Sequence, residues 1–280
     1  MLYRFGGEAV LIYRTKENFI ENNINPFTNM PYDSSWIIYQ LTDSIDYQMI
    51  NGGRDNGVYT LKVSKQYPHW KMSVFDFIQF QEACNRNIIL SISDEDFNAA
   101  KFYYGNHNYN DAFLRNYESD VLVHSTTLEN WKKIENDGCL RSWNVLKKDN
   151  AAFEIQPIGK LLGDPDDFCD YIMFSNGGIS GEIVVLSKQM GKIMMDQDLE
   201  YQPGARLYFD MQKIAKDGLL VRDGCHLKVK DILPLSPYLI WVATWESVGL
   251  KSSLSTPKEF TELSNSTFNK LFGKNVVATF

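Results

Sequence analysis

The stretch VLVHSTTLENWKKIENDGCL, residues 121–140, joins an apolar, strand-like run to a helix-like run through a single histidine, His124. Thr126 and Glu129 have the spacing of a capping box, in which two side chains bond to backbone N–H groups at a helix start. Apolar residues then recur at helical spacing, and Gly138 is of the type that commonly ends a helix. The stretch therefore predicts a strand, a corner at His124 and a capped helix.

Outward from this stretch, most signals between residues 120 and 250 are those of strands. The dipeptide Asp223-Gly224 is a strong hairpin-turn signal between two of them. One or two helices are expected in this half, which predicts an α+β domain built around antiparallel sheet. The predicted strands are VLVH (121–124), YIMFS (171–175), EIVVLS (182–187), ARLYFD (205–210), LLVR (219–222), HLKV (226–229) and YLIWVAT (238–244).

The first part of the chain mixes strand and helix signals and predicts a smaller α+β region of unknown role over residues 1–117. VYTLKVS (58–64) alternates like a strand and follows a turn at Asp55-Asn56-Gly57. Residues 72–86 have helical spacing with Ser73 as a possible N-cap, 88–92 form a short strand, and 93–105 form a helix capped by Ser93. Residues 105–120 form the best candidate linker. The second domain is predicted over 118–250 and a helical tail over 251–280, with Pro257 behind Thr256 at its helix start.

Composition limits the classes of function. A chain of 280 residues with 44% hydrophobic residues can bury one large core or two smaller ones. Mean hydropathy is −0.30 and no apolar run approaches membrane-spanning length, so we expect a soluble, cytoplasmic protein without a membrane partner. Its four cysteines are scattered without CxxC pairs, which is typical of reduced thiols. A net charge of −7 counts against generic nucleic-acid binding, which requires a cationic surface.

Several familiar sites are absent from the sequence. It contains no GxSxG, P-loop or GxGxxG pattern, so no common hydrolase, NTPase or dinucleotide fold is indicated. The segment GDPDDF (163–168) lacks the glycine and the distant glutamate of a calcium loop. The cysteines and His226 lack metal-ligand spacing, so no metal site is predicted.

Taken alone, His124 is more often a structural residue of a strand-to-helix corner. The pattern H-x-T at a strand end, followed by a capped helix, nevertheless resembles the first motif of the ADP-ribosyltransferase superfamily, which includes the DNA-modifying DarT toxins and the RNA 2′-phosphotransferases. The segments GCLRSWNVLKK (138–148), DYIMFS (170–175) and the block from RLYFD to SPYLI (206–240) follow in the family's order. The resemblance covers about residues 121–240 and implies a split antiparallel β-sheet and NAD as substrate.

The resemblance also implies roles for particular residues. His124, with Ser125 or Thr126, would hold the nicotinamide ribose and carboxamide of NAD, although the family usually has glycine where Ser125 stands. Tyr171 would pack on the nicotinamide, and Ser142 and His226 are further candidates for cofactor binding. His226 alternates with Lys228, which predicts a solvated or groove-lining face for both.

The resemblance implies charged groups in the site as well. Arg206 or Arg141 would hold the pyrophosphate through forked hydrogen bonds. The late glutamate required by transferases of this kind is Glu182 or Glu246. Glu182 is preferred, because it is expected to open a buried strand after a glycine-rich turn. A solvated position at the strand edge is the alternative for Glu182.

Three functions are consistent with the sequence. The first is transfer of ADP-ribose from NAD to a macromolecular acceptor, nucleic acid or protein, with release of nicotinamide. The second is a catalytically inactive module of the same fold that binds a nucleotide or a partner. The third is an RNA 2′-phosphotransferase-like enzyme, against which the missing arginine set counts. The resemblance thus predicts a toxin-like glycosyltransferase in the first case and only its fold in the second.

Overall fold

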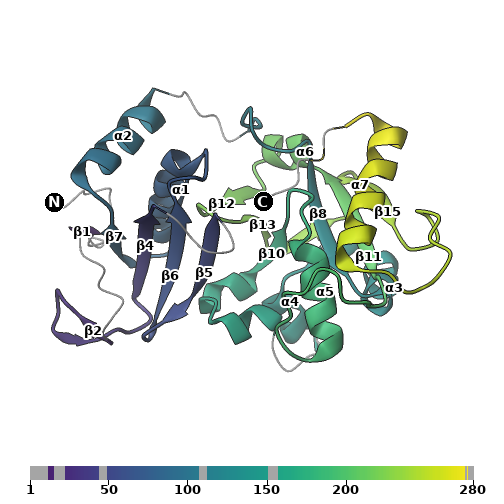
Figure 1. Ribbon diagram of the computed structural model, residues 1–280, viewed down its shortest axis with the longest axis horizontal. Coiled ribbons are helices and arrows are strands. Elements are labelled where there is room, and N and C mark those ends of the chain that lie inside the picture. Colours follow the sequence, from purple (N-terminus) through teal and green to yellow (C-terminus); the bar gives the residue numbers. More distant parts are fainter. Residues whose placement is uncertain are drawn as a thin grey trace. The chain divides into compact units, whose positions relative to one another are not determined.

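The structure is a computed structural model of the chain, and it describes residues 12–15, 23–43, 49–106, 112–150, 157–274 and 276. The chain divides into two compact units with mixed α+β structure, which confirms the predicted fold class in its coarse form (Figure 1). The first unit comprises Met1–Asn108, Gly159–Asp166 and Arg222–Cys225, and the second comprises Tyr109–Ile158, Asp167–Val221 and His226–Phe280.

The first unit is built on a five-stranded sheet with the order β1-β7-β4-β6-β5. Neighbouring strands are parallel except at β5, which is antiparallel to β6 and joined to it by the predicted turn at Asn56 and Gly57. Its strands are β1 (Ile12–Thr15), β4 (Trp36–Thr42), β5 (Ile50–Asp55), β6 (Val58–Ser64) and β7 (Asn87–Ser91), with β2 (Ile24–Asn25) and β3 (Met30–Pro31) as a separate hairpin.

Among the described residues this unit has two α-helices, and the sequence predicts one of their starts correctly. Helix α2 (Asp94–Gly105) begins after Ser93, whose hydroxyl accepts a hydrogen bond from the backbone of Asp96, as expected of an N-cap. Helix α1 (Trp70–Ala83) begins after His69 instead, so the N-cap prediction for Ser73 is wrong. Ser73 lies inside the helix, where it is buried. Of the predicted linker, residues 107–111 lie outside the described residues.

The second unit has two three-stranded antiparallel sheets, ordered β15-β11-β8 and β10-β13-β12. A two-stranded pair, β14 with β9, accompanies them. The strands are β8 (Val121–Thr126), β9 (Cys139–Arg141), β10 (Tyr171–Phe174), β11 (Ala205–Asp210), β12 (Leu220–Arg222), β13 (Leu227–Lys230), β14 (Ile232–Pro234) and β15 (Leu239–Ala243). Six of the seven predicted strands in this half are therefore present.

The seventh, EIVVLS, is helical, and this half contains more helices than the sequence predicts. Between residues 120 and 250 the described residues form four α-helices rather than one or two: α3 (Leu128–Asp137), α4 (Trp143–Lys148), α5 (Ser180–Met190) and α6 (Met211–Lys216). Helix α7 (Pro257–Phe272) forms in the tail that the sequence predicts to be helical. Helix α5 buries Val185 and Leu186, and its run of β-branched residues imitates a strand in the sequence. Glu182 therefore lies in the first turn of a helix, and the strand prediction for it is wrong.

The opening stretch folds as a strand, a corner and a helix, with a shift of one residue at the cap. The N-cap of α3 is Thr127, whose hydroxyl accepts from the backbone of Asn130, rather than Thr126. Gly138 ends the helix with a φ of 69°, a left-handed conformation that glycine adopts without strain. The apolar residues of α3, which recur at helical spacing, pack on the core of the unit.

Two apolar clusters cover opposite faces of the sheet that contains β8. One cluster includes Leu122 and Leu207 together with Ile172 and Val229 of the other sheet. The second cluster includes Val123 and Tyr208 and is completed by Phe260 and Phe268 of α7, the expected C-terminal helix, which starts at Pro257 behind Thr256. Within the described residues, no helix is long and apolar enough to cross a membrane.

Candidate functional site

The candidate site lies where strands β8 and β10 separate, which we call the fork. Val123 and Ser175 form a bridge between the strands, with N–H···O distances of 2.7 and 2.9 Å. From there β8 continues in its pairing with β11, whereas β10 pairs with β13. His124 follows the bridged Val123 directly, so the predicted corner histidine lies at the fork.

The His124 ring is tied to the other side of the fork. Its Nδ1 lies 3.1 Å from the backbone carbonyl oxygen of Met173. Because a carbonyl oxygen only accepts hydrogen bonds, this contact assigns the proton to Nδ1. The ring also meets Phe174 edge-on, with centroids 5.9 Å apart. The ring is therefore fixed in both position and tautomer.

Burial controls the charge of His124. It lowers the pKa of the imidazole to about 4, with the hydrogen bond to Met173 acting in the opposite direction and the charge of Lys188 lowering it further. At neutral pH the ring is thus uncharged, and Nε2 has a lone pair. In the described part of the chain no group donates to Nε2. The nitrogen is consequently a hydrogen-bond acceptor available to a ligand.

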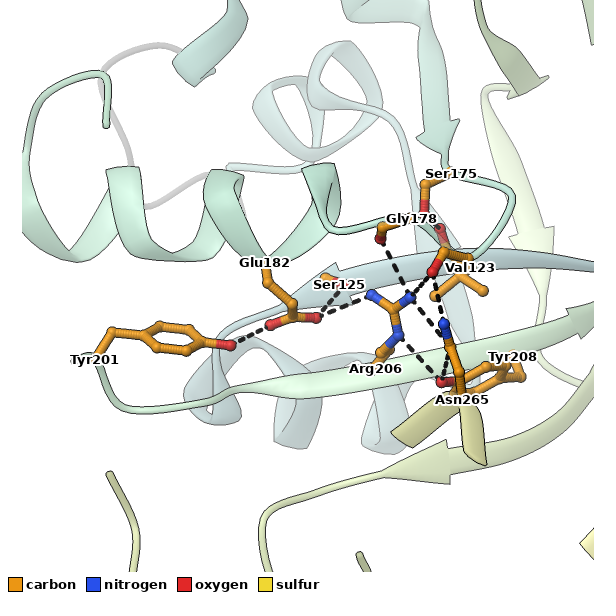
Figure 2. A network of polar contacts seen from close by, with 10 residues as sticks. Val123, Ser125, Ser175, Gly178, Glu182, Tyr201, Arg206, Tyr208 and Asn265 are labelled. Atoms are coloured by element: carbon orange, nitrogen blue, oxygen red, sulfur yellow. Dashed lines mark hydrogen bonds and ion pairs between the residues drawn. The ribbon is translucent and has the colours of Figure 1, made fainter. Parts of the chain in front are cut away.

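Ser125 leads to a different environment, a buried charged network shown in Figure 2. Its hydroxyl donates to Oε1 of Glu182 at 2.6 Å, and the hydroxyl of Tyr201 donates to Oε2 at 2.6 Å. Nη1 of Arg206 donates to the same Oε1 at 3.3 Å and forms an ion pair whose side chains are 0% and 1% exposed. Glu182 thus has three donors, and its carboxylate is fully enclosed.

Arg206 uses its remaining donors on the protein as well. Its Nη2 donates to the carbonyl oxygens of Gly177 at 2.5 Å and Gly178 at 3.2 Å, in the loop between β10 and α5. The same nitrogen donates to Oδ1 of Asn265 in α7, and Nε donates to the hydroxyl of Tyr208. The guanidinium therefore connects β11, the β10–α5 loop, α5 and α7 (Figure 2).

The structure does not bring His124 and Glu182 to the same side of the sheet. In the antiparallel pair of β8 and β11, His124 lies opposite Leu207, and Ser125 lies opposite Arg206. Directly opposed residues share a face and successive residues alternate, so His124 and Ser125 leave opposite faces. His124 leaves the face that carries Leu207 and is partly exposed, and Ser125 leaves the face that is covered by α5 and α7.

Thr126 and Ser142, two predicted NAD contacts, lie where the backbone packs closely or a helix begins. Thr126 ends β8 and is buried, and its carbonyl oxygen passes so close to Gly204 that a Cβ there would lie 1.8 Å from it. Ser142 is the N-cap of α4, where its hydroxyl accepts from the backbone of Val145 at 3.4 Å. The side chain of Ser142 is therefore engaged at a helix start.

Tyr171, His226 and Lys228 lie around the second sheet. Tyr171 is partly buried at the start of β10, two residues before Met173, and His226 is partly buried just before β13 and meets Phe168 edge-on at 5.5 Å. Lys228 is fully buried, with its ammonium 4.2 Å from the Phe168 ring and 4.6 Å from the Tyr171 ring. The prediction of a solvated or groove-lining face is therefore wrong for Lys228.

The remaining charged candidates lie outside this arrangement. Arg141 pairs with the carboxylates of Asp137 and Asp149. Glu246 is exposed in the turn after β15. Ala243 at the end of β15 lies opposite Arg206, which lies opposite Ser125, so Glu246 follows at the same end of the sheet as Ser125. Among the residues that the structure describes, no cluster of His, Cys, Asp and Glu could hold a metal ion.

The sequence does not indicate Met173, Tyr201, Tyr208 or Asn265 as residues of the site. Only Tyr208 had an available signal, because alternation along 205–210 places it on the same face as Arg206. Comparisons of the chain with protein-family models, with curated proteins and with solved structures found no match.

Proposed function

We propose that the second unit binds NAD at the fork and acts as an ADP-ribosyltransferase-like enzyme, transferring ADP-ribose to a macromolecular acceptor with release of nicotinamide. The observation that carries the proposal is His124: a neutral imidazole with Nδ1 tied to Met173 and Nε2 available as an acceptor. The proposal is also supported by two three-stranded sheets that separate next to this residue, although the sheet of an ADP-ribosyltransferase stays a prediction.

The state of His124 suits the chemistry of nicotinamide departure. A ribose hydroxyl donates one hydrogen bond, and Nε2 of the neutral ring is the matching acceptor. As the glycosidic bond to nicotinamide breaks, positive charge develops on the ribose, as in other oxocarbenium-like transition states. An imidazole with a pKa of about 4 stays uncharged at neutral pH and so does not oppose that charge. The lone pair on Nε2 instead stabilises the positive charge that develops on the ribose.

The other predicted NAD contacts fit to different degrees. Tyr171 shares a strand with Met173, but alternation places its ring on the opposite face of β10 from Phe174, whose ring meets His124, so its role as a wall for the nicotinamide stays a prediction. Arg206 does not fit as a pyrophosphate ligand, because it is fully buried and donates to protein groups. Arg141 is engaged by two carboxylates. The pyrophosphate contacts therefore belong to groups not yet assigned.

A second candidate is an NAD-binding module without turnover, and one observation favours it. Glu182, the preferred catalytic carboxylate, has three donors and no exposed surface, so it is not poised to act on a substrate. Glu246 is exposed, follows the end of β15 on the side where Ser125 lies, and is the alternative catalyst. The 2′-phosphotransferase alternative is less favoured, since Arg206 and Arg141 are both committed to protein partners.

The test is an NAD titration by calorimetry paired with a nicotinamide-release assay, on the full chain and on two variants. His124→Ala removes the acceptor and should weaken NAD binding about tenfold or more, the effect of losing a buried hydrogen bond. His69→Ala, in the first unit, is the matched control and should bind like the parent. Binding with release supports the transferase, and binding without release supports the inactive module. Absence of NAD binding, or equal binding by the His124→Ala variant, contradicts the proposal.

A further inference from the structure

The Glu182 network has a property that a catalytic carboxylate does not need: it fixes both sides of the fork. On the β8 side, Glu182 holds the hydroxyl of Ser125, the residue that follows His124. On the β10 side, Arg206 holds the carbonyl oxygens of Gly177 and Gly178, just after the bridged Ser175. The ion pair between Glu182 and Arg206 joins these two attachments.

His124 itself lies between two anchored neighbours. Val123 before it is fixed by the backbone bridge to Ser175, and Ser125 after it is fixed by the hydrogen bond to Glu182. The backbone on both sides of the histidine is thus held, although its side chain leaves the opposite face. A displacement of Ser125 would change the direction of the His124 Cα–Cβ bond and hence the reach of Nδ1 toward Met173.

The packing of α5 against β8 supports the same role. Gly181 precedes Glu182, and a Cβ at this position would lie 2.6 Å from the Ser125 hydroxyl oxygen and 3.1 Å from its Cβ. The missing side chain of Gly181 therefore lets the helix approach β8 closely enough for Glu182 to receive the Ser125 hydroxyl. The hydroxyl of Tyr201 donates to the other carboxylate oxygen of Glu182, Oε2.

From these contacts we infer that Glu182 is a positioning residue, which acts through Ser125 and Arg206 to hold His124 at the fork in the orientation that binds NAD. This inference rests on the proposed function only for its last step, the binding of NAD. The orientation of the His124 ring is a property of the protein alone and is measurable without a ligand.

The experiment uses the full chain with ¹⁵N-labelled histidine and two readouts: the Nδ1 and Nε2 resonances of His124, assigned with His124→Gln, and NAD affinity by calorimetry. Glu182→Gln and Ser125→Ala remove the attachment from its two ends. Ser187→Ala is the matched control, because this buried serine of the same helix bonds to the backbone of Met194 and not to β8. Tyr201→Phe removes a hydrogen bond from the same carboxylate without detaching Ser125.

Ser125→Ala and Glu182→Gln should each shift the His124 resonances and weaken NAD binding roughly tenfold. The double variant should bind NAD no more weakly than the more affected of the two single variants, as expected of residues acting through one contact. Ser187→Ala should leave both readouts unchanged, and Tyr201→Phe should have the smaller effect on them. If Glu182→Gln does not fold, Ser125→Ala alone decides the matter.

Two results would overturn the inference. In the first, the His124 resonances of Ser125→Ala and Glu182→Gln match those of the parent. In the second, Glu182→Gln abolishes nicotinamide release while the ring resonances and NAD affinity stay unchanged, which would make Glu182 catalytic. If the parent chain does not bind NAD, the proposed function fails, but the ring resonances still decide whether Glu182 positions His124.

Discussion

The two faces of β8 use polar residues in opposite ways. On one face, His124 has a single hydrogen bond through Nδ1 and an available acceptor at Nε2. On the other, Ser125 joins a carboxylate and a guanidinium whose hydrogen bonds all go to protein groups. Adjacent residues of one strand thus have different roles. The free acceptor of His124 can bind a ligand, whereas the ion pair next to Ser125, whose hydrogen bonds are all made within the protein, holds segments of the chain together. The predictions below test this difference.

The largest effect is expected from breaking the buried pair. Arg206→Leu leaves the enclosed Glu182 carboxylate without its cation, which should lower the free energy of unfolding by about 3–5 kcal/mol. Urea unfolding followed by circular dichroism measures it. Arg141→Leu is the matched control, because its two ion pairs are partly exposed to solvent and should be worth about 1 kcal/mol or less. Equal losses in the two variants would contradict the structural role of the network.

The next effect concerns the pH dependence of stability. The pKa of His124 falls from 6.5 to about 4 on folding, so between these pH values the imidazole is protonated in the unfolded chain but not in the folded chain. The contribution of His124 to the free energy of unfolding is therefore fully present above pH 6.5. It is lost as the pH falls toward 4, and the total loss is about 3 kcal/mol for a pKa shift of this size. Urea unfolding at several pH values should show this slope, and His124→Gln should reduce it. An unchanged slope in the variant would rule out His124 as its source.

A smaller effect is expected where α5 meets β8. Alanine favours helices over glycine by about 1 kcal/mol, so a solvent-facing replacement should stabilise the protein. Gly181→Ala should instead destabilise it by about 1–2 kcal/mol, because the new methyl group displaces the Ser125 hydroxyl from Glu182. Gly105→Ala, at the end of α2 with open space around it, is the control and should not destabilise. Thermal unfolding of both variants gives the comparison, and a stabilised Gly181→Ala would disprove the close approach.

The smallest effect separates a helix cap from a ligand contact. Ser142→Ala removes the N-cap of α4 and should cost about 1 kcal/mol of stability, as capping serines usually do. NAD affinity should not change, since the hydroxyl is engaged with the helix start. A loss of NAD affinity without loss of stability would instead show that Ser142 contacts NAD. Thr127→Ala, which removes the cap of α3, gives the reference size for such a loss.

Local patterns in the sequence predict much of this architecture. The strands at 121–126 and 205–210, the turn after Asp55 and the start of α7 depend on alternation, turn residues and capping, which neighbouring residues determine. The sequence does not predict helix α5, because its β-branched run has the composition of a strand and only its packing decides in favour of a helix. Local propensity thus succeeded wherever tertiary contacts agreed with it.

The site was predictable only in part. Alternation already places His124 and Ser125 on opposite faces of β8, so their different surroundings follow from the sequence once the strand is recognised. The partners of the network do not follow, because Tyr201 and Asn265 reach Glu182 and Arg206 from loops and helices with no spacing rule between them. The acceptor state of His124 likewise depends on a carbonyl 49 residues away.

The most direct test of the central claim is a titration of the ¹⁵N-histidine-labelled parent chain with NAD. The account predicts a saturable shift of the His124 Nε2 resonance, with Nδ1 still protonated and the His69 resonances unmoved. Saturable NAD binding that leaves the His124 resonances in place would contradict the account, as would the absence of binding.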